Sequence, residues 1–171
     1  MERAEQVRPT PGTLHHVELW VPDLPRALRS FGWLLGELGY EQYQDWPHGR
    51  SWRKAATYIV VEASPARSAA THDRKRPGLN HLAFHVEDRA ALDRLVAQAP
   101  GYGWSLLFAD QHPHAGGAEH EAGYLEDEDG FEVELVVIEP ADAAKTEAGT
   151  EAGAESGNGN GAETEPGDAA C

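Results

Sequence analysis

Hydrophobic and polar positions alternate with a period of two in residues 79–86. The alternating residues are His81, Leu82, Ala83, Phe84, His85 and Val86. This pattern is typical of a β-strand with one apolar face and one face that carries two imidazoles. Asp88 follows in a helix N-cap position, and apolar residues recur at helical spacing through residues 88–99. The stretch therefore predicts a strand followed by a helix.

The same pattern occurs once before, in residues 14–21. His16 precedes His81 by 65 positions, and Asp23 precedes Asp88 by the same distance. Both copies alternate apolar residues with a face that begins at a histidine. A repeated strand–helix unit of this length indicates two copies of one supersecondary module, which can build a single site between them.

Each repeat is followed by three further strand candidates, so the predicted module is βαβββ. After the first helix, which Gly39 ends, they cover residues 41–46, 51–55 and 57–62; after the second, residues 104–109, 120–126 and 131–138. The expected fold class is α+β, with both modules in one cup-shaped, partly open mixed β-sheet and the helices outside. The expected boundaries are a flexible lead-in (1–12), two modules (13–63 and 79–140) joined by a linker (64–78), and a tail (141–171).

The tail differs from the rest of the chain in composition. Residues 141–171 contain no aromatic residue and no Val, Leu, Ile or Met. Such a segment buries too little apolar surface to offset its ordering entropy, so we expect it to be disordered. Its seven acidic residues and one lysine supply −6 of the formal charge of −15. The remaining −9 argues against a nucleic-acid partner, because nucleic-acid binding depends on neutralising phosphates.

The compartment is inferred from cysteine usage and hydropathy. The one cysteine, Cys171, lies in the tail, so structural disulfides are not expected. No apolar run is long enough to cross a membrane, and no signal-peptide core is present at the start. We therefore expect a cytoplasmic protein with a small-molecule substrate and no membrane partner.

The polar faces of three predicted strands carry candidate metal ligands. His16 and His81 open the first strand of each module, and Glu134 lies on the polar face of the last strand. Taken singly, each is more often an ordinary surface residue. If both modules curl into one cup, however, two histidines and a carboxylate converge inside it, and this is a facial triad for a divalent metal with open coordination positions.

These features resemble the vicinal oxygen chelate superfamily, which includes glyoxalases, extradiol dioxygenases, fosfomycin-resistance thiol transferases and bleomycin-binding proteins. The resemblance rests on the paired βαβββ units, the opening histidines and the ending Asp127-x-Asp129-Gly130-x-x-x-Glu134. It implies a metal bound by His16, His81 and Glu134, within one chain or across a homodimer, and a substrate that chelates the metal through neighbouring oxygens. Fe²⁺ or Mn²⁺ is the favoured ion, with Zn²⁺ and Ni²⁺ as alternatives.

Tyr124 extends the resemblance toward extradiol dioxygenases. In their signature the matching tyrosine hydrogen-bonds the substrate beside the metal, although Glu128 replaces the usual proline here and Gly123 a bulky apolar residue. The resemblance also requires a catalytic histidine. The sequence leaves open which one: the candidates are His85, His112, His114 and His120.

The leading hypothesis is thus a metal-dependent, dioxygenase-like enzyme. The alternatives are a glyoxalase-like lyase or isomerase, a thiol transferase, and a metal-free protein that sequesters a small molecule. The expected substrate-binding residues, chosen as an aromatic wall with cations for an anionic substituent, are Trp20, Trp46, Trp52, Arg50, Arg53 and His120.

Overall fold

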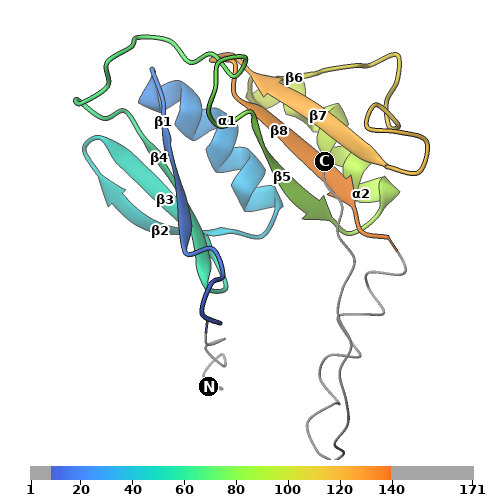
Figure 1. Ribbon diagram of the computed structural model, residues 1–171, viewed down its shortest axis with the longest axis horizontal. Helices are drawn as coiled ribbons and strands as arrows, with labels where there is room; N and C mark the ends of the chain where they lie inside the picture. The colour runs from blue at the N-terminus through green and yellow to red at the C-terminus, as the bar shows by residue number, and fades with distance from the viewer. Residues whose placement is uncertain (1–8, 140–171) are drawn as a thin grey trace, which may run out of the picture. The chain divides into compact units, whose positions relative to one another are not determined.

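A computed structural model describes residues 9–139 and contains both predicted modules (Figure 1). The first module consists of β1 (His16–Trp20), α1 (Leu24–Glu37), β2 (Glu41–Trp46), β3 (Gly49–Lys54) and β4 (Thr57–Glu62). The second consists of β5 (His81–Val86), α2 (Arg89–Gln98), the short 3-10 helix η1 (Ala99–Tyr102), β6 (Trp104–Leu106), β7 (Ala122–Asp127) and β8 (Glu132–Val137). The predicted α+β fold of two βαβββ modules is confirmed.

Both helices begin at the predicted aspartates. The Asp23 carboxylate accepts a hydrogen bond from the Arg26 backbone N–H at 2.8 Å, and the Asp88 carboxylate accepts one from Ala91 N–H at 2.8 Å. Each cap satisfies a donor that the first helical turn leaves without a partner. The repeat therefore includes the local signal that starts each helix.

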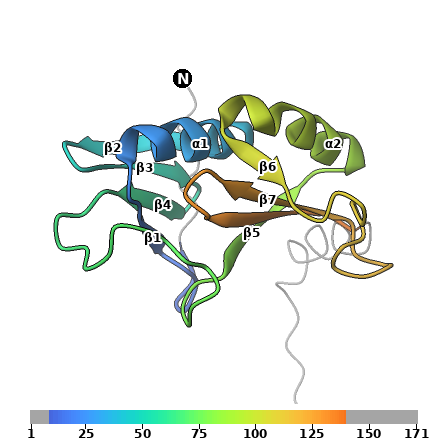
Figure 2. The same ribbon diagram turned by 90° about the horizontal axis from the view of Figure 1, so that it is seen from above.

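Each module forms its own four-stranded sheet, and the two sheets have the same strand order. The orders are β1-β4-β3-β2 and β5-β8-β7-β6, with the first strand of each module parallel to the last. Among the described residues no strand of one sheet pairs with a strand of the other. Both helices lie on the same side of the two sheets, next to each other (Figure 2). The polar faces of the first strands point away from these helices.

Helix α1 holds the two modules together. Phe31 is almost fully buried and makes edge-to-face contacts with Trp104 and Phe131 of the second module, at ring-centroid distances of 5.2 and 5.9 Å. The Trp104 indole N–H donates to the Ser30 carbonyl at 3.1 Å. The hydrophobic core is thus continuous between the modules, although the sheets are not.

An ion pair at the turn between β7 and β8 reinforces this contact. Two guanidinium nitrogens of Arg26 donate to the two carboxylate oxygens of Asp129, at 2.5 and 3.1 Å. Such bidentate geometry fixes orientation as well as distance. The turn that precedes Glu134 is therefore anchored on α1.

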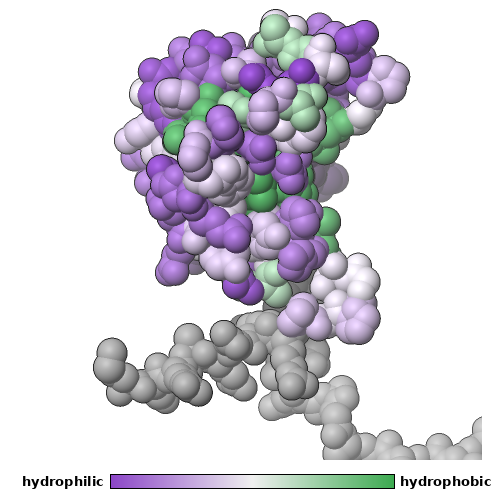
Figure 3. Space-filling model, turned by 90° about the vertical axis from the view of Figure 1, so that its left-hand side faces the viewer, coloured by the Kyte–Doolittle hydropathy of each residue, from purple (hydrophilic) through white to green (hydrophobic). Residues whose placement is uncertain are grey.

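The outer strand β2 is exposed along nearly its whole length. It forms an edge of the first sheet, on the left in Figure 1, and the view from that side shows predominantly hydrophilic residues (Figure 3). Charged side chains of this kind protect a free sheet edge from pairing with other chains. No helix between residues 9 and 139 is long and apolar enough to span a membrane.

The two modules belong to one compact unit, which ends at Ile138. This limit lies close to the predicted domain end at residue 140. The predicted disordered tail, with Cys171, lies outside the described residues.

Candidate functional site

The second module brings His81 and Glu134 together. They lie on the neighbouring parallel strands β5 and β8, where Ala83 is the register partner of Glu134. The His81 Nε2 atom is 3.3 Å from Glu134 Oε2. The Glu134 side chain is largely buried, whereas that of His81 is one-third exposed. The carboxylate is thus shielded, and the imidazole beside it remains accessible.

Asn80 fixes the orientation of the His81 ring. The Asn80 amide nitrogen donates to the Arg74 carbonyl at 3.2 Å, so the amide oxygen is the atom that faces His81 Nδ1, at 2.8 Å. Because an amide oxygen only accepts, Nδ1 must carry a proton. In the neutral ring, Nε2 then presents its lone pair toward the Glu134 carboxylate. The Nε2 lone pair and the carboxylate then face each other at 3.3 Å, an arrangement that a shared proton or a bound cation would stabilise.

Arg74 anchors the segment that carries Asn80. Its guanidinium lies 2.7 Å from Glu132 Oε2 and 3.0 Å from Glu126 Oε1. The Glu132 side chain is almost completely buried, so this pair neutralises a charge that would be costly to bury alone. Glu132 is therefore committed to Arg74, whereas Glu134 faces the imidazoles.

Two more groups contact Glu134. The His120 Nε2 atom lies 2.6 Å from Glu134 Oε1, and the Tyr124 hydroxyl donates to the same carboxylate. Burial alone would raise the Glu134 pKa, but hydrogen bonds from Tyr124 and His120 outweigh it and the pKa lies below its usual value. Burial, together with the contact to Glu134, raises the pKa of Tyr124 to about 12. Glu134 is thus held ionised beside a neutral phenol.

The loop between β6 and β7 closes over these groups at Gly116. A Cβ atom at this position would lie 2.5 Å from the His120 ring and 2.8 Å from the Tyr124 hydroxyl. Only glycine lets the backbone pass this close. The loop therefore packs directly against the two side chains that contact Glu134.

His16 lies in the other module. Its ring stacks on Tyr58 with 4.8 Å between centroids, and its Nδ1 is 2.9 Å from His15 Nδ1. Both histidines are exposed. No group of three or more His, Cys, Asp or Glu side chains in the described part of the chain is placed to hold a metal ion. His81 and His120 do flank Glu134, but they contact different carboxylate oxygens. One chain thus brings together two of the three predicted ligands.

Most of the predicted substrate-binding residues lie in the first module. Arg50 is paired with Asp45 at 2.6 Å, and Arg53 lies over the Tyr43 ring at 5.0 Å. The expectation for Trp52 is wrong: it is 5% exposed, pairs with the core residue Ile59 and packs against Gly32 of α1. The side of the sheet on which Trp52 lies is set by the pairing of β3 with β4, which no local pattern in the sequence reveals.

The remaining predicted residues have different surroundings. Trp20 is half-exposed, and the Trp46 ring covers Gly49. His85 is exposed on β5, and His114 is exposed in the β6–β7 loop. His120, predicted to bind substrate, instead contacts Glu134 directly. Arg74 did not stand out in the sequence, because its partners Glu126 and Glu132 are distant in the chain. Asn80 adjoins His81, but its role depends on the contact of its amide nitrogen with the Arg74 carbonyl, which the sequence does not reveal.

Comparison with known proteins assigns the family. The glyoxalase/bleomycin resistance protein/dioxygenase superfamily profile matches residues 15–124. The chain is 44% identical over 124 residues to the uncharacterized protein YqjT of Bacillus subtilis (strain 168), which covers 72% of this chain and 97% of that protein. The protein therefore belongs to the glyoxalase/bleomycin resistance protein/dioxygenase superfamily.

Solved structures agree with this assignment. A Bacillus halodurans protein of known crystal structure superposes with a TM-score of 0.71 and 43% sequence identity, over 75% of this chain and 97% of that chain. The lactoylglutathione lyase of Agrobacterium tumefaciens superposes with a TM-score of 0.53 over 75% and 96% of the two chains. At 18% identity the second likeness concerns the fold alone.

Proposed function

We propose that the protein is a divalent-metal-dependent enzyme whose metal is bound by His81, Glu134 and a third imidazole. The observation that carries the proposal is the pair of electron donors, His81 Nε2 and Glu134 Oε2, at 3.3 Å. The Asn80 contact directs the unprotonated nitrogen toward the carboxylate. Imidazole and carboxylate suit Fe²⁺, Mn²⁺, Ni²⁺ and Zn²⁺, and Fe²⁺ or Mn²⁺ is favoured for a two-histidine, one-carboxylate set.

The third imidazole has two candidates. His16 of a second copy is the first, in a homodimer in which each metal lies between the first module of one protomer and the second module of its partner. Leu14 and Leu79 support this arrangement. Each lies two residues before a candidate histidine, and they are 59% and 45% exposed. If His16 of one protomer met His81 of its partner, both leucines would be covered in the same interface. Two-fold symmetry would form this contact twice, once for each metal site. The second candidate is His120 of the same chain.

The metal would act as a Lewis acid that holds a substrate through neighbouring oxygens. The protein's own groups have distinct tasks. Glu134, kept ionised by its hydrogen bonds, offsets the positive charge of the site. Tyr124, with its pKa raised to about 12, keeps its proton and can redirect its one hydrogen bond from Glu134 to a substrate oxygen. His120 contacts Glu134 and can receive a proton at the edge of the site.

Metal content tests the proposal directly. We expect wild-type protein to bind about one ion per chain, and His81→Ala and Glu134→Gln to lose it, because each removes a ligand. Glu132→Gln is the matched control, since Glu132 is the neighbouring carboxylate on β8 but is paired with Arg74. If Glu132→Gln and Glu134→Gln lost equal amounts of metal, the assignment of Glu134 as the metal ligand would be wrong.

The reaction class is tested after anaerobic loading with Fe²⁺. A dioxygenase-like activity predicts oxygen uptake with catechols, and chelation should abolish this uptake without unfolding the protein. Isomerisation of a thiohemiacetal, or transfer of a thiol, would instead favour the glyoxalase-like or transferase alternatives. We place the activity in the cytoplasm, because the one cysteine lies in the tail.

A metal-free binding protein is the second candidate function. It is favoured by the contacts that His120 and Tyr124 make with Glu134 within one chain, which stabilise the carboxylate without an ion. It predicts ligand binding that persists in metal-stripped protein and no turnover of any chelating substrate.

A further inference from the structure

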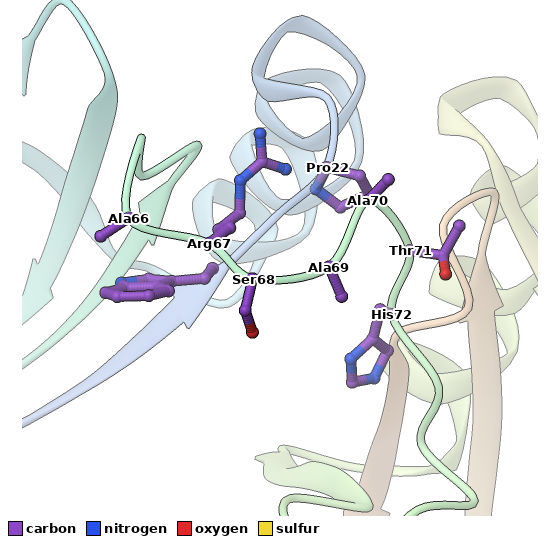
Figure 4. Close-up of a pocket in the computed structure, with 9 residues that line it drawn as sticks. Pro22, Ala66, Arg67, Ser68, Ala69, Ala70, Thr71 and His72 are labelled. Atoms are coloured by element: carbon purple, nitrogen blue, oxygen red, sulfur yellow. The ribbon is translucent and has the colours of Figure 1, made fainter.

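A pocket of about 220 Å³ lies between the end of β1 and the segment that joins the two modules (Figure 4). Trp20 and Pro22 line it from the strand side, and residues 66–72 line it from the joining segment. Engineered cavities of roughly 150 Å³ hold benzene, and drug-sized ligands need about 300 Å³ or more. The volume therefore suits a ligand with one ring.

The joining segment is long but held at both ends. Residues 63–80 contain no helix or strand. The Ala63 N–H donates to the His48 carbonyl at 2.8 Å, Arg67 Nη1 donates to the Val21 carbonyl at 2.7 Å, and Arg74 is paired with two glutamates. Structureless loops of this length that remain ordered are usually functional. The pocket lies between these anchors.

The pocket has two fixed flat rings. The Trp20 indole N–H donates to Glu18 Oε1 at 2.6 Å, which fixes the direction of a ring that is 46% exposed. His72 is stacked on Phe131 with 3.9 Å between centroids and an interplanar angle of 4°. Burial lowers the pKa of His72 and so favours its neutral form. Small side chains, chiefly alanines, leave the space around the rings open.

The charged side chain that lines the pocket is a cation, although the Glu18 carboxylate contacts Trp20 from outside the lining. The lining contains Arg67 and no carboxylate. Arg67 donates to the Val21 and Ser64 carbonyls, but it forms no ion pair with any Asp or Glu in the described residues. Most arginines of this unit, by contrast, are paired with acids. A guanidinium without a counter-ion beside a pocket favours an anionic ligand group.

We propose that this pocket binds a small aromatic carboxylate, with one face of its ring against Trp20 and its carboxylate toward Arg67. The Ser68 and Thr71 hydroxyls can donate further hydrogen bonds to ring substituents. Trp20 lies on the same strand face as His16, so the pocket is placed to hold a substrate or effector of the first module. Binding here requires no metal, so the inference stands or falls independently of the proposed metal site.

The test is titration of full-length, metal-stripped protein with benzoate, followed by ligand-observed NMR and calorimetry. We expect saturable binding at one site per chain. Benzamide, which keeps the ring but lacks the charge, should bind about tenfold more weakly, because it loses the charge-assisted contact. Cyclohexanecarboxylate, which keeps the charge but lacks the flat ring, should also bind more weakly.

Variants assign the site. Trp20→Leu and Arg67→Gln should each weaken benzoate binding about tenfold. Arg76→Gln is the matched control, because Arg76 is exposed in the same joining segment but does not line the pocket. No benzoate binding, equal binding of benzamide, or equal effects of Arg76→Gln and Arg67→Gln would overturn the proposal. The benzamide comparison uses wild-type protein and so holds even if Arg67→Gln loosens the joining segment.

Discussion

Asn80 illustrates how one hydrogen bond can select the reactive atom of a histidine. Its amide nitrogen is taken by the Arg74 carbonyl, so its oxygen requires a proton on His81 Nδ1. Partners of this kind fix the tautomer of a metal-binding imidazole. The adjacent residue in the sequence thus determines which nitrogen faces Glu134.

The Asn80→Ala variant tests this role. We expect metal affinity to fall roughly 10–100-fold, because the His81 ring loses its orientation. Competition with a chelator of known affinity measures the effect. Asn80→Asp keeps an acceptor oxygen toward Nδ1 and should bind metal more tightly than the alanine variant. If the wild type and the alanine variant bound metal with equal affinity, Asn80 would not be needed to orient His81.

Asp127 is a buried carboxylate whose charge costs stability. Burial raises its pKa, although its Oδ1 atom accepts hydrogen bonds from the Phe131 and Asp129 N–H groups at 2.9 and 3.0 Å. A carboxyl whose pKa is higher in the folded state stabilises the fold below the unfolded pKa. It loses that contribution as the pH rises through the folded pKa.

We therefore expect Asp127→Asn to gain stability relative to wild type as the pH rises from 4 to 7. Asn keeps the acceptor oxygen for the turn and carries no charge. Denaturant unfolding at several pH values measures the difference. Asp110→Asn, an exposed site, should show no such trend. If the stability of Asp127→Asn relative to wild type fell with rising pH, the pKa of Asp127 would be lowered by folding rather than raised.

At the scale of elements, α1 connects the modules through Phe31. Phe31→Ala should lower the free energy of unfolding by about 3–5 kcal/mol, because it empties a fully buried aromatic site between the modules. Phe108→Ala is the matched control, since Phe108 is 48% exposed, and should cost far less. Thermal or denaturant unfolding compares the two. Similar losses would mean that the module contact is not built on this ring.

The elements themselves followed from local signals. The alternation in residues 79–86 and the aspartate caps predicted β5 and α2. Parity placed both Glu132 and Glu134 on the polar face of the last strand and so could not separate them. Glu134 was selected by the family-like ending of residues 127–134, and its carboxylate lies beside His81. Local patterns did not reveal the pairing of Arg74 with Glu126 and Glu132, because it joins residues more than 50 positions apart. Trp52 was misplaced for a related reason: its face of β3 is set by pairing with Ile59 of β4.

At the scale of the whole molecule, the sequence could not state how many chains complete the site. It placed equivalent histidines on two modules, and the fold leaves His16 on one sheet and His81 with Glu134 on the other. Repetition of a module predicts matching half-sites. His16 can meet His81 and Glu134 within one chain or between two chains. Which of these occurs depends on an interface that the alternation of residues along each strand does not specify.

Metal binding by a mixture of two defective variants tests the account most directly. His16→Ala and Glu134→Gln should each fail to bind metal alone. If each site takes His16 from one protomer and His81 with Glu134 from its partner, refolding an equal mixture restores one intact site in every mixed dimer. The account predicts about one quarter of the wild-type metal content. No metal in the mixture, or full metal in His16→Ala alone, would contradict a site shared between two chains.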